Sequence, residues 1–557
     1  MNDKDDNRIS AIMNSHTISL NTPINYSKAP KQYYHHSTKM PSLTPTPEPI
    51  STSSFIQLDN LPTEILVLII DNLSQFELVN LSQVNKKISR LCHEKLFRNI
   101  IVDANFNIFD SNEFRTHSVT YINSSYNFKK FVKLATTSEK KHAEIERFMC
   151  LNMPENVDLY SHEIHHDLKV MFSNFHKLKE LVWIIDDGLD LEILDVLPNK
   201  DILETLILNI KSNVISNEFF EDLVFKNLKN LQIFPFYTSN YLSNIIDKIV
   251  VNCADLNMLG LTKFPSIIQA IPHRQQLTYE VEFLWIPKVF RKINKSTNLA
   301  NLTVLSLNDV MVTYMDAKML TKSVTLSNLT TLHLRGVTEL TDTTVSDSFL
   351  LILAPQLTSL SHLSLDIEET KTEYLPDFLL ELPSLLTSLD VKIRKREETP
   401  FDTYSHSITR HNGLIKLSVE LSDQEDHSLN HIPSEFYKSL AKLTKLQSLR
   451  INSSSLSDTS SGLLYLLSQL PQLTFLDVFG KQAGGMPILG LDMIHPTIFD
   501  DWFKVQHVVF IFLENNHTLK YVRINSCLFV CDYSKMIVNP NDGLNMWFDR
   551  NVKIITF

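Results

Sequence analysis

Glycine is scarce in this sequence, with 10 residues among 557. That is about 2%, against roughly 7% in an average protein. The shortage excludes collagen-like structure and disfavours dinucleotide and P-loop sites, where glycine lets the backbone approach a phosphate. Gly480, Gly484, Gly485 and Gly490 cluster but lack the Lys-Ser/Thr pair of a P-loop, so they indicate a flexible insertion. We therefore expect no cofactor.

Cysteine is also rare, and long apolar runs are absent. The cysteines at 92, 150, 253, 527 and 531 are odd in number and scattered, which favours a reducing compartment over a disulfide framework. The acidic first residues lack the apolar core of a signal peptide, and no run of about 18 apolar residues predicts a membrane span. We expect a cytoplasmic or nuclear protein.

Basic residues do not dominate the charge. Lys and Arg number 52 against 63 Asp and Glu, for a formal net charge of −11. A nucleic-acid backbone is therefore not expected as the principal partner. The length predicts either three or four domains, at roughly 100–200 residues each, or one open-ended repeat array.

Leucine, by contrast, is abundant and periodic from about residue 170 onward, in the pattern Leu-x-x-Leu-x-Leu. Full copies begin at Leu203, Leu302, Leu329 and Leu360, and copies with one substituted apolar residue begin at Leu178, Leu228, Leu256, Leu386, Leu414, Leu446, Leu473 and Leu519. Most copies are 25–32 residues apart. This spacing is close to the 20–29 residue period of leucine-rich repeats.

Two intervals of 46 residues interrupt the period. For the first we predict a degenerate strand at Val281-Glu282-Phe283. The second contains an insertion from Gly480 to Pro496 and then a helical stretch from Phe499 to Leu513. The charged segment from Arg394 to Asn412 lacks the repeat and is predicted to be an excursion on one rim. An early strand is predicted at residues 147–151.

These patterns predict an α/β fold, a leucine-rich-repeat solenoid shaped like a horseshoe. Alternate side chains of a strand point to opposite faces, so the two leucines of Leu-x-Leu enter the core while the intervening residue faces the concave side. Segments such as 374–382 and 461–470 have helical character and are expected on the convex side. No repeat buries its apolar face alone, so the repeats must stack.

Residues 1–54 are rich in Ser, Thr and Pro and are expected to be a disordered tail. From 55 to 102, apolar residues recur at helical spacing and predict three short helices. Pro62 is suited to a first helical turn, and Ser74-Gln75-Phe76-Glu77 has capping-box spacing for the second helix. Residues 103–170 are expected to hold a linker and irregular repeats, and 171–557 the solenoid.

The segment from Leu58 to Ile100 resembles the F-box. The resemblance rests on Leu61-Pro62-Thr63-Glu64-Ile65-Leu66, followed about twenty residues later by Val84-Asn85-Lys86-Lys87. Ile88 and Glu77 depart from the tryptophan and aspartate common in the family. Together with the repeats, the chain resembles the F-box/leucine-rich-repeat family of ubiquitin-ligase adaptors. Heavy use of Asn, Ser, Ile and Lys suggests a fungal source.

The resemblance implies a non-catalytic adaptor. Its F-box would bind the Skp-type linker, and through it the cullin and RING subunits, while the repeats hold a substrate protein for ubiquitination. Carried over by position, the linker-facing residues are Leu61, Pro62, Ile65, Ile69, Leu78, Leu81 and Val84. The same residues could also form only the core of the three helices. A scaffold that works without degradation is the alternative within the same family.

Substrate selection would fall to side chains on the concave face. The candidates are Phe234, His333, Arg335, Lys392, Arg450, Phe479 and Arg523. The four cations alternate with Asp366, Asp390, Glu420 and Asp477, so the surface is mixed and does not clearly indicate phosphate recognition.

His162-Glu163-Ile164-His165-His166 matches the zinc-protease pattern His-Glu-x-x-His. Two histidines one helical turn apart would bind zinc, and the glutamate would activate its water. Glu180 is the nearest third ligand in the sequence. We prefer an exposed polar turn or helix here, and we predict no metal and no catalytic residue. A zinc-dependent hydrolase remains the alternative from another functional class.

Overall fold

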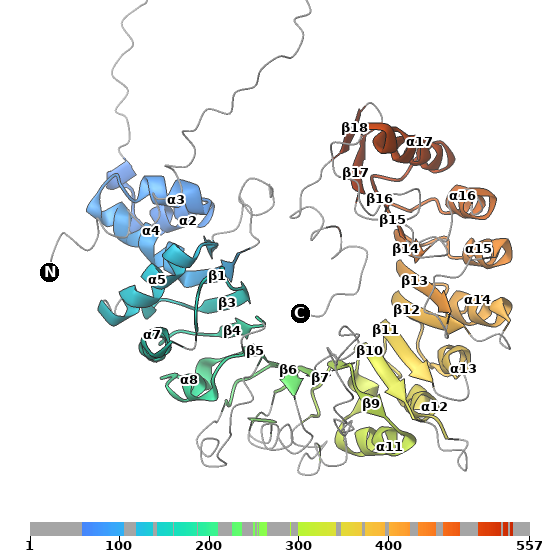
Figure 1. Ribbon diagram of the computed structural model, residues 1–557, viewed down its shortest axis with the longest axis horizontal. Helices are drawn as coiled ribbons and strands as arrows, with labels where there is room; N and C mark the ends of the chain where they lie inside the picture. The colour runs from blue at the N-terminus through green and yellow to red at the C-terminus, as the bar shows by residue number, and fades with distance from the viewer. Residues whose placement is uncertain are drawn as a thin grey trace, which may run out of the picture.

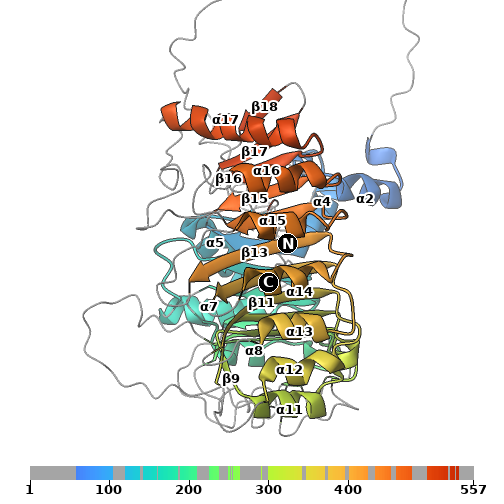
Figure 2. The same ribbon diagram turned by 90° about the vertical axis from the view of Figure 1, so that its right-hand side faces the viewer.

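The computed structural model describes residues 58–104, 119–137, 142–159, 161–185, 188–209, 225–236, 249–250, 253, 255–263, 290, 299–340, 347–369, 374–395, 400–423, 433–452, 460–479, 499–524, 527–532, 535–538 and 548. Residues 1–54 and the predicted strand at 281–283 lie outside these ranges. The fold is mixed α/β and is built around one large, mostly parallel sheet. The sheet curves into an arc, with strands on its inner side and helices on its outer side (Figures 1 and 2).

Among the described residues, 18 strands form the sheet. They are β1 Asn99–Asp103, β2 Thr120–Ile122, β3 Arg147–Asn152, β4 Glu180–Trp183, β5 Thr205–Asn209, β6 Asn230–Phe236, β7 Met258–Lys263, β8 Val304–Asn308, β9 Met311–Val312, β10 Thr331–Glu339, β11 His362–Glu369, β12 Ser388–Lys395, β13 Lys416–Asp423, β14 Ser448–Asn452, β15 Phe475–Phe479, β16 Tyr521–Ile524, β17 Cys527–Asp532 and β18 Lys535–Val538. Pairing follows chain order except that β1 lies between β2 and β3, and that β8 and β9 both pair with β10. The last two pairings, β16–β17 and β17–β18, are antiparallel.

The α-helices of the described residues fall into two groups. Near the first strand lie α2 Thr63–Asp71, α3 Gln75–Leu81 and α4 Lys86–Arg98. Along the arc lie α5 Ser125–Thr137, α7 His162–Ser173, α8 Leu191–Asp195, α11 Tyr314–Ser323, α12 Phe349–Leu353, α13 Leu375–Glu381, α14 Phe401–Thr409, α15 Ser434–Leu440, α16 Ser460–Gln469 and α17 Phe499–Asn515. The predicted helices at 374–382, 461–470 and 499–513 correspond to α13, α16 and α17, and the predicted strand at 147–151 corresponds to β3.

Leucines align across the parallel strands, and this alignment builds the core. Leu332 of β10 pairs with Leu363, which pairs with Leu389, and the row continues through Leu417 and Leu449. All five side chains are at most 1% exposed. Alternation in a strand places them on one face, against the outer helices. Buried apolar residues distributed between Ile70 and Phe529 form one continuous cluster.

One expectation about the irregular intervals needs correction, and another lies outside the described residues. β7 pairs directly with β8, with Leu259 opposite Leu305, while the predicted strand at 281–283 lies in the part of the chain that is not described. β15 likewise pairs directly with β16. The charged segment 394–412 is not a rim excursion throughout, because residues 401–409 form helix α14 in the outer layer.

Candidate partner-binding surfaces

Helices α2, α3 and α4 form a small module. Its core consists of residues from these helices together with residues of the first strand. Leu66, Ile70, Ile88 and Cys92 are buried. Lys95 pairs with Asp71 at 2.6 Å and Lys87 donates to the Leu61 carbonyl at 3.1 Å, so α4 is tied to both ends of α2. The capping box expected at Ser74 and Glu77 is present and fixes the start of α3. We call residues 58–98 the helical module.

The helical module leaves several apolar side chains uncovered. Leu68 and Val84 are each 61% exposed, Phe76 is 55% exposed and Ile65 is 43% exposed. Ile69 and Val67 are exposed to a lesser degree. In the described chain such exposure of large apolar residues is concentrated here, whereas elsewhere it falls on isolated positions such as Met315 and Leu385. We call these six residues the apolar face.

The predicted linker-facing residues divide between this face and the interior. Ile65, Ile69 and Val84 belong to the apolar face, and Pro62 at the start of α2 is exposed beside it. Leu61 and Leu81 are half-buried. Leu78 is only 1% exposed and packs in the core, so it supports the module and offers no surface to a partner.

The linker-facing residues predicted from the sequence do not include Leu68 and Phe76, which are among the most exposed residues of the apolar face. A signal for Leu68 existed, because helix α2, Thr-Glu-Ile-Leu-Val-Leu-Ile-Ile-Asp, is apolar on nearly all sides. A helix that is apolar all round must be covered on all sides. The core of the helical module covers only Leu66 and Ile70, which leaves the opposite side for another surface.

The helical module is attached to the arc through α4, which runs directly into β1. Phe97 near the end of α4 stacks 6.4 Å from Phe131 of α5, and Phe131 stacks 6.2 Å from Phe148 of β3. The backbone N–H of Tyr121 in β2 donates to Gln75 of α3 at 3.0 Å. The apolar face is therefore held at one end of the arc.

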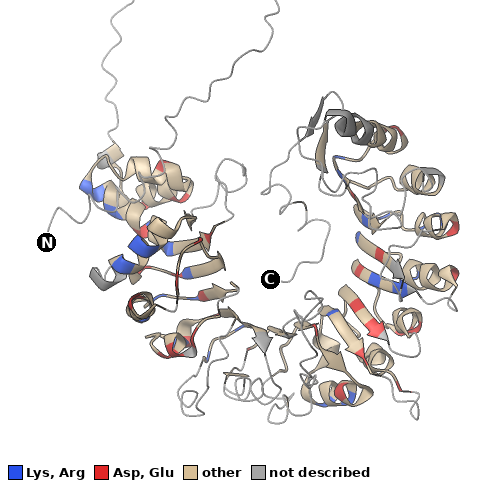
Figure 3. Cartoon of the chain, viewed as in Figure 1, with Lys and Arg blue, Asp and Glu red and all other residues tan. Residues whose placement is uncertain are grey.

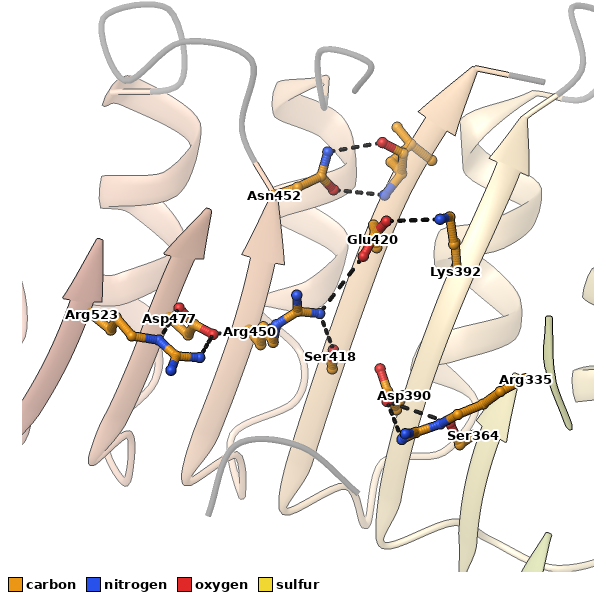
Figure 4. Close-up of polar contacts among 11 residues, drawn as sticks. Arg335, Ser364, Asp390, Lys392, Ser418, Glu420, Arg450, Asn452, Asp477 and Arg523 are labelled. Atoms are coloured by element: carbon orange, nitrogen blue, oxygen red, sulfur yellow. Dashed lines mark hydrogen bonds and ion pairs between the residues drawn. The ribbon is translucent and has the colours of Figure 1, made fainter. Parts of the chain in front are cut away.

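A second candidate surface is the inner face of the arc from β10 to β16, where residues of both charge signs lie on neighbouring strands (Figure 3) and their side chains pair across strands (Figure 4). Arg335 donates to Ser364 on the next strand at 2.8 Å and to Asp390 two strands away at 3.0 Å. Lys392 pairs with Glu420 at 3.1 Å. The predicted candidates Arg335 and Lys392 are thus already matched with acidic partners.

The pairing continues through Asp477, whose side chain is 1% exposed. Arg523 makes two hydrogen bonds to its carboxylate, at 3.0 and 2.6 Å. Arg450 reaches the same carboxylate from the other side at 3.3 Å and also lies 3.9 Å from Glu420. A buried carboxylate between two guanidinium groups is well compensated, since each charge has an opposite neighbour in a poorly solvated place.

Aromatic rings cover the planes of both guanidinium groups. Phe479 lies over Arg450, with its ring centroid 3.7 Å from the guanidinium carbon. Phe548 lies over Arg523 at 4.6 Å. Arg523 is only 8% exposed. Of the seven predicted concave residues, Arg450, Phe479 and Arg523 therefore come together at one place.

His333 is placed differently from the prediction of a binding residue. It is 1% exposed, in the same inner row as Ser306 and Ser364, and burial, helped by the nearby Arg335 and His362, lowers its pKa to about 3. It is a neutral structural histidine in this fold. Phe234 lies on the inner face of β6, half-buried against Ile207 in an apolar cluster that extends back to β1.

A cavity of about 700 Å³ opens beside the ends of β1, β3 and β4. Its lining includes Asn123, Ser124, Asn152, Glu155 and Asn156, together with backbone and apolar groups. Its polar lining thus combines amide, hydroxyl and carboxylate side chains.

The His-Glu-x-x-His motif lies at the first turns of α7. His162, Glu163 and His166 are exposed there, and His165 pairs with Asp190 at 3.3 Å. Among the described residues, no three His, Cys, Asp or Glu side chains gather in a group that could hold a metal ion. The third ligand that a zinc site needs is thus missing from the described surroundings, and the motif marks the polar start of a helix.

Residues 58–103 match the model of the F-box-like family. This segment contains the helical module and β1, and it carries the whole apolar face. No curated protein matches the chain. No helix in the described part of the chain is both long enough and apolar enough to cross a membrane.

Proposed function

We propose that the chain is the substrate-recognition adaptor of a Skp–cullin–F-box ubiquitin ligase. The apolar face of the helical module binds the Skp-type linker, and the inner face of the arc holds a substrate protein. The observation that carries the proposal is the coincidence of two facts. The segment that matches the F-box-like family is also the one with a concentrated, uncovered apolar face.

The apolar face has the character of a protein-binding surface. Soluble proteins rarely leave contiguous large apolar side chains in water, and patches of this kind mark interaction sites. Leu68, Phe76 and Val84 come from three neighbouring segments rather than from one helix. A partner that buried them would gain about 25 cal/mol per Å² of apolar surface removed from water.

We infer further that the part of the arc from about residue 171 onward is a leucine-rich-repeat solenoid, and that the chain begins its folded part with an F-box at 55–102. Supporting this are the register-matched leucines, the parallel pairing of successive strands and the helices on the outer side. A curved array of stacked units presents a long concave surface, which such proteins use to bind other proteins. The chain then makes no bonds itself, and catalysis belongs to its partners.

A charge substitution on the apolar face tests linker binding. We expect Leu68→Glu in the full chain to weaken binding of a recombinant Skp-type linker by at least about thirtyfold, as for a central interface residue. Because Leu68 is 61% exposed, the substitution leaves the free chain folded. Met315→Glu on α11 is the matched control, since Met315 is 50% exposed but lies on the arc. Binding is measured by biolayer interferometry, with thermal unfolding of each variant alongside.

Equal linker affinity for the native chain and Leu68→Glu would refute the assignment of the apolar face. A second measurement concerns the cullin subunit, which should be recovered with the linker in a pull-down by the native chain. Recovery of the linker without cullin would instead favour a scaffold that acts without degradation.

A further inference from the structure

The cavity of about 700 Å³ lies where the strand order of the sheet reverses, beside the helical module (Figure 1). β2 pairs on one side of β1, whereas β3 pairs on the other side and is followed in that direction by β4 and β5. The carboxyl ends of β1 and β3 border the cavity through Ala104 and Leu151. In parallel α/β sheets, ligands bind outside the carboxyl ends of the strands at such a reversal. The cavity and the topology therefore indicate the same place.

The wall of the cavity is fixed by contacts between β1 and β3. Their register shifts after Val102, so that Asp103 lies opposite Asn152. The Asn152 side chain donates to Asp103 at 2.8 Å, and its backbone carbonyl accepts the N–H of Ala104 at 3.0 Å. Irregularities of this kind change the direction of side chains at the end of a strand pair. Asn152 is therefore held in place at the cavity although it is exposed.

The cavity adjoins an apolar strip on the inner face of the arc. The base of the strip is a row of buried side chains on neighbouring strands, Ile101, Met149, Val182 and Ile207. Tyr121, Leu151 and Phe234 pack on this row and are half-buried. Ile184, two residues after Val182 and so on the same face, is 36% exposed. We call Tyr121, Leu151, Ile184 and Phe234 the inner strip. Leu151 and Ile184 also line the cavity, so the two form one surface.

The inner strip differs from the charged rows on β10 to β16. There, Arg335, Lys392 and Arg523 are already matched by acidic side chains, and a charged partner would have to replace existing ion pairs. At the inner strip a partner removes apolar surface from water without breaking any such pair. A partner therefore gains more from the end of the inner face that lies next to the helical module.

The polar lining of the cavity indicates what kind of ligand it accepts. Its amide and hydroxyl groups, on Asn123, Ser125 and Asn156, can both donate and accept hydrogen bonds, as the backbone of an extended peptide requires. Glu155 is the one charged side chain among the described residues that line the cavity, and it is exposed. A phosphate or a carboxylate would meet no cation there. The lining thus fits an uncharged or basic peptide.

The extent of the surface favours a peptide over a small molecule. From Leu151 on β3 to Phe234 on β6 the inner strip crosses neighbouring strands, over about 14 Å at the usual strand spacing. About four residues of an extended chain cover that distance. A ligand confined to the cavity would leave most of the inner strip uncovered, whereas a peptide that enters the cavity covers both.

We propose that the cavity and the inner strip bind an extended, non-acidic segment of a protein partner. The peptide backbone lies along the Asn and Ser side chains of the cavity, and a large apolar side chain packs on Leu151 and Ile184. The inference rests on the proposed function in one respect, that this partner is the substrate. It specifies the substrate by chemistry, as a protein with an accessible apolar segment free of phosphate and of excess acidic residues.

Selection from random peptides tests the proposal. Phage that display short random peptides are selected on the immobilised full-length native chain, and the affinities of enriched peptides are measured by fluorescence anisotropy. We expect a group of peptides with a large apolar side chain and no excess of Asp or Glu. These should bind Ile184→Glu at least about tenfold more weakly than the native chain. Ile415→Glu is the matched control, because Ile415 is 37% exposed but precedes β13, and it should bind them like the native chain.

Three further variants identify where the peptides bind. Ile184→Ala adds no charge and should weaken binding in the same direction but less, with thermal unfolding showing that each variant is folded. Glu155→Lys should weaken peptides that contain Lys or Arg by about threefold and leave uncharged ones unchanged. Leu68→Glu should bind the whole group like the native chain, whereas peptides that bind the apolar face of the helical module lose affinity for it.

The proposal is overturned if no enriched peptides lose affinity for Ile184→Glu while keeping it for Leu68→Glu. It is also overturned if the peptides that do so are acidic. These measurements contain no Skp-type linker. If linker binding fails while the peptides behave as expected, only the ligase assignment is lost. If the peptides fail while Leu68→Glu weakens linker binding, only the inner strip is lost as a binding site.

Discussion

At the scale of single residues, burial keeps His411 neutral at a place where it bridges two elements. His411, fully buried after α14, accepts the backbone N–H of Leu386 on Nδ1 at 3.3 Å. Its Nε2 lies 3.1 Å from the carbonyl of Leu379 in α13 and donates to it. A proton on Nδ1 would break the first of these bonds. The pKa of His411 is lowered to about 4, mainly by burial and to a smaller extent by the nearby Arg410, against the raising effect of the Leu379 hydrogen bond.

The free energy of unfolding should therefore decrease as the pH falls, because folded His411 resists protonation. Its pKa in the folded chain, about 4, is below the value of roughly 6.5 expected when unfolded. Above pH 7 both states are neutral and no penalty exists. As the pH falls from about 6.5 towards 4, the unfolded chain takes up a proton that the folded chain refuses, and at pH 5 this costs about 2 kcal/mol.

Urea unfolding at pH 7.5 and pH 5 measures this loss. The native chain should lose about 2 kcal/mol more than His411→Gln between the two pH values, because the variant has no proton to gain. His507→Gln, which removes an exposed histidine on α17, should keep the native pH dependence. Equal losses for the native chain and His411→Gln would contradict the prediction.

Residue-level roles were predicted well where periodicity decides them and poorly where cross-strand neighbours decide them. The core leucines follow from the Leu-x-x-Leu-x-Leu spacing alone. The cations Arg335 and Arg523 were correctly placed on the inner face, but their acidic partners stand on other strands, 55 and 46 residues away in the sequence. Phe548 is not part of any period, so nothing in the sequence pointed to its burial.

At the scale of elements, strand β10 shows how the sheet accommodates an irregularity. Its first half pairs with β8 and its second half with the short strand β9. The register with β11 shifts between Leu334 and Val337, where Gly336 adopts a φ of 61°. A Cβ at Gly336 would lie 2.2 Å from Oδ1 of Asp309, so the turn of the preceding strand pair leaves no room for a side chain.

Gly336→Ala should consequently destabilise the arc. Both the left-handed φ and the contact with Asp309 oppose alanine, and we expect a loss of at least about 2 kcal/mol. Gly413→Ala is the matched control, because the nearest atom to its new Cβ would be the Leu386 carbonyl at an ordinary 3.7 Å. Thermal unfolding distinguishes them, with a clear drop in midpoint for Gly336→Ala and almost none for Gly413→Ala. A similar midpoint for both variants would show that the β10 irregularity is not constrained by this glycine.

Element boundaries in the sequence were predictable only where caps or repeats mark them. Ser74 and Glu77 indicated the start of α3. The leucine pattern predicted the positions of most strands to within a residue or two. The long intervals before β8 and β16 do not change the strand order, because β7 pairs directly with β8 and β15 directly with β16. The spacing of the leucine pattern gives only distances along the chain, whereas the order of strands in the sheet depends on which strands pair.

At the scale of the whole molecule, one continuous core joins the helical module to the arc. Phe97, Phe131 and Phe148 link α4, α5 and β3, and the same apolar cluster extends as far as Phe529 in β17. Each strand nevertheless contacts mainly its two neighbours. In such quasi-one-dimensional arrays, stability is close to a sum of unit and nearest-neighbour terms. A ligand at one end should therefore stabilise nearby units most.

Binding of the Skp-type linker to the apolar face offers a way to see this gradient. At a free linker concentration of 100 times its dissociation constant, the module gains about 2.7 kcal/mol against unfolding. Because Phe97 couples α4 to Phe131, part of this gain should reach β3 and β4, and little should reach β16 at the far end. Hydrogen exchange with and without the linker should thus slow in peptides covering residues 147–152 and 180–183 and stay unchanged in 521–532. Leu68→Glu with the same linker is the control and should show clearly less slowing, because a thirtyfold weaker affinity reduces the gain from about 2.7 to about 0.9 kcal/mol at the same linker concentration. Equal slowing along the whole arc would mean that it opens only as a single unit, and slowing confined to residues before 103 would mean that the Phe97 contacts do not couple the two parts.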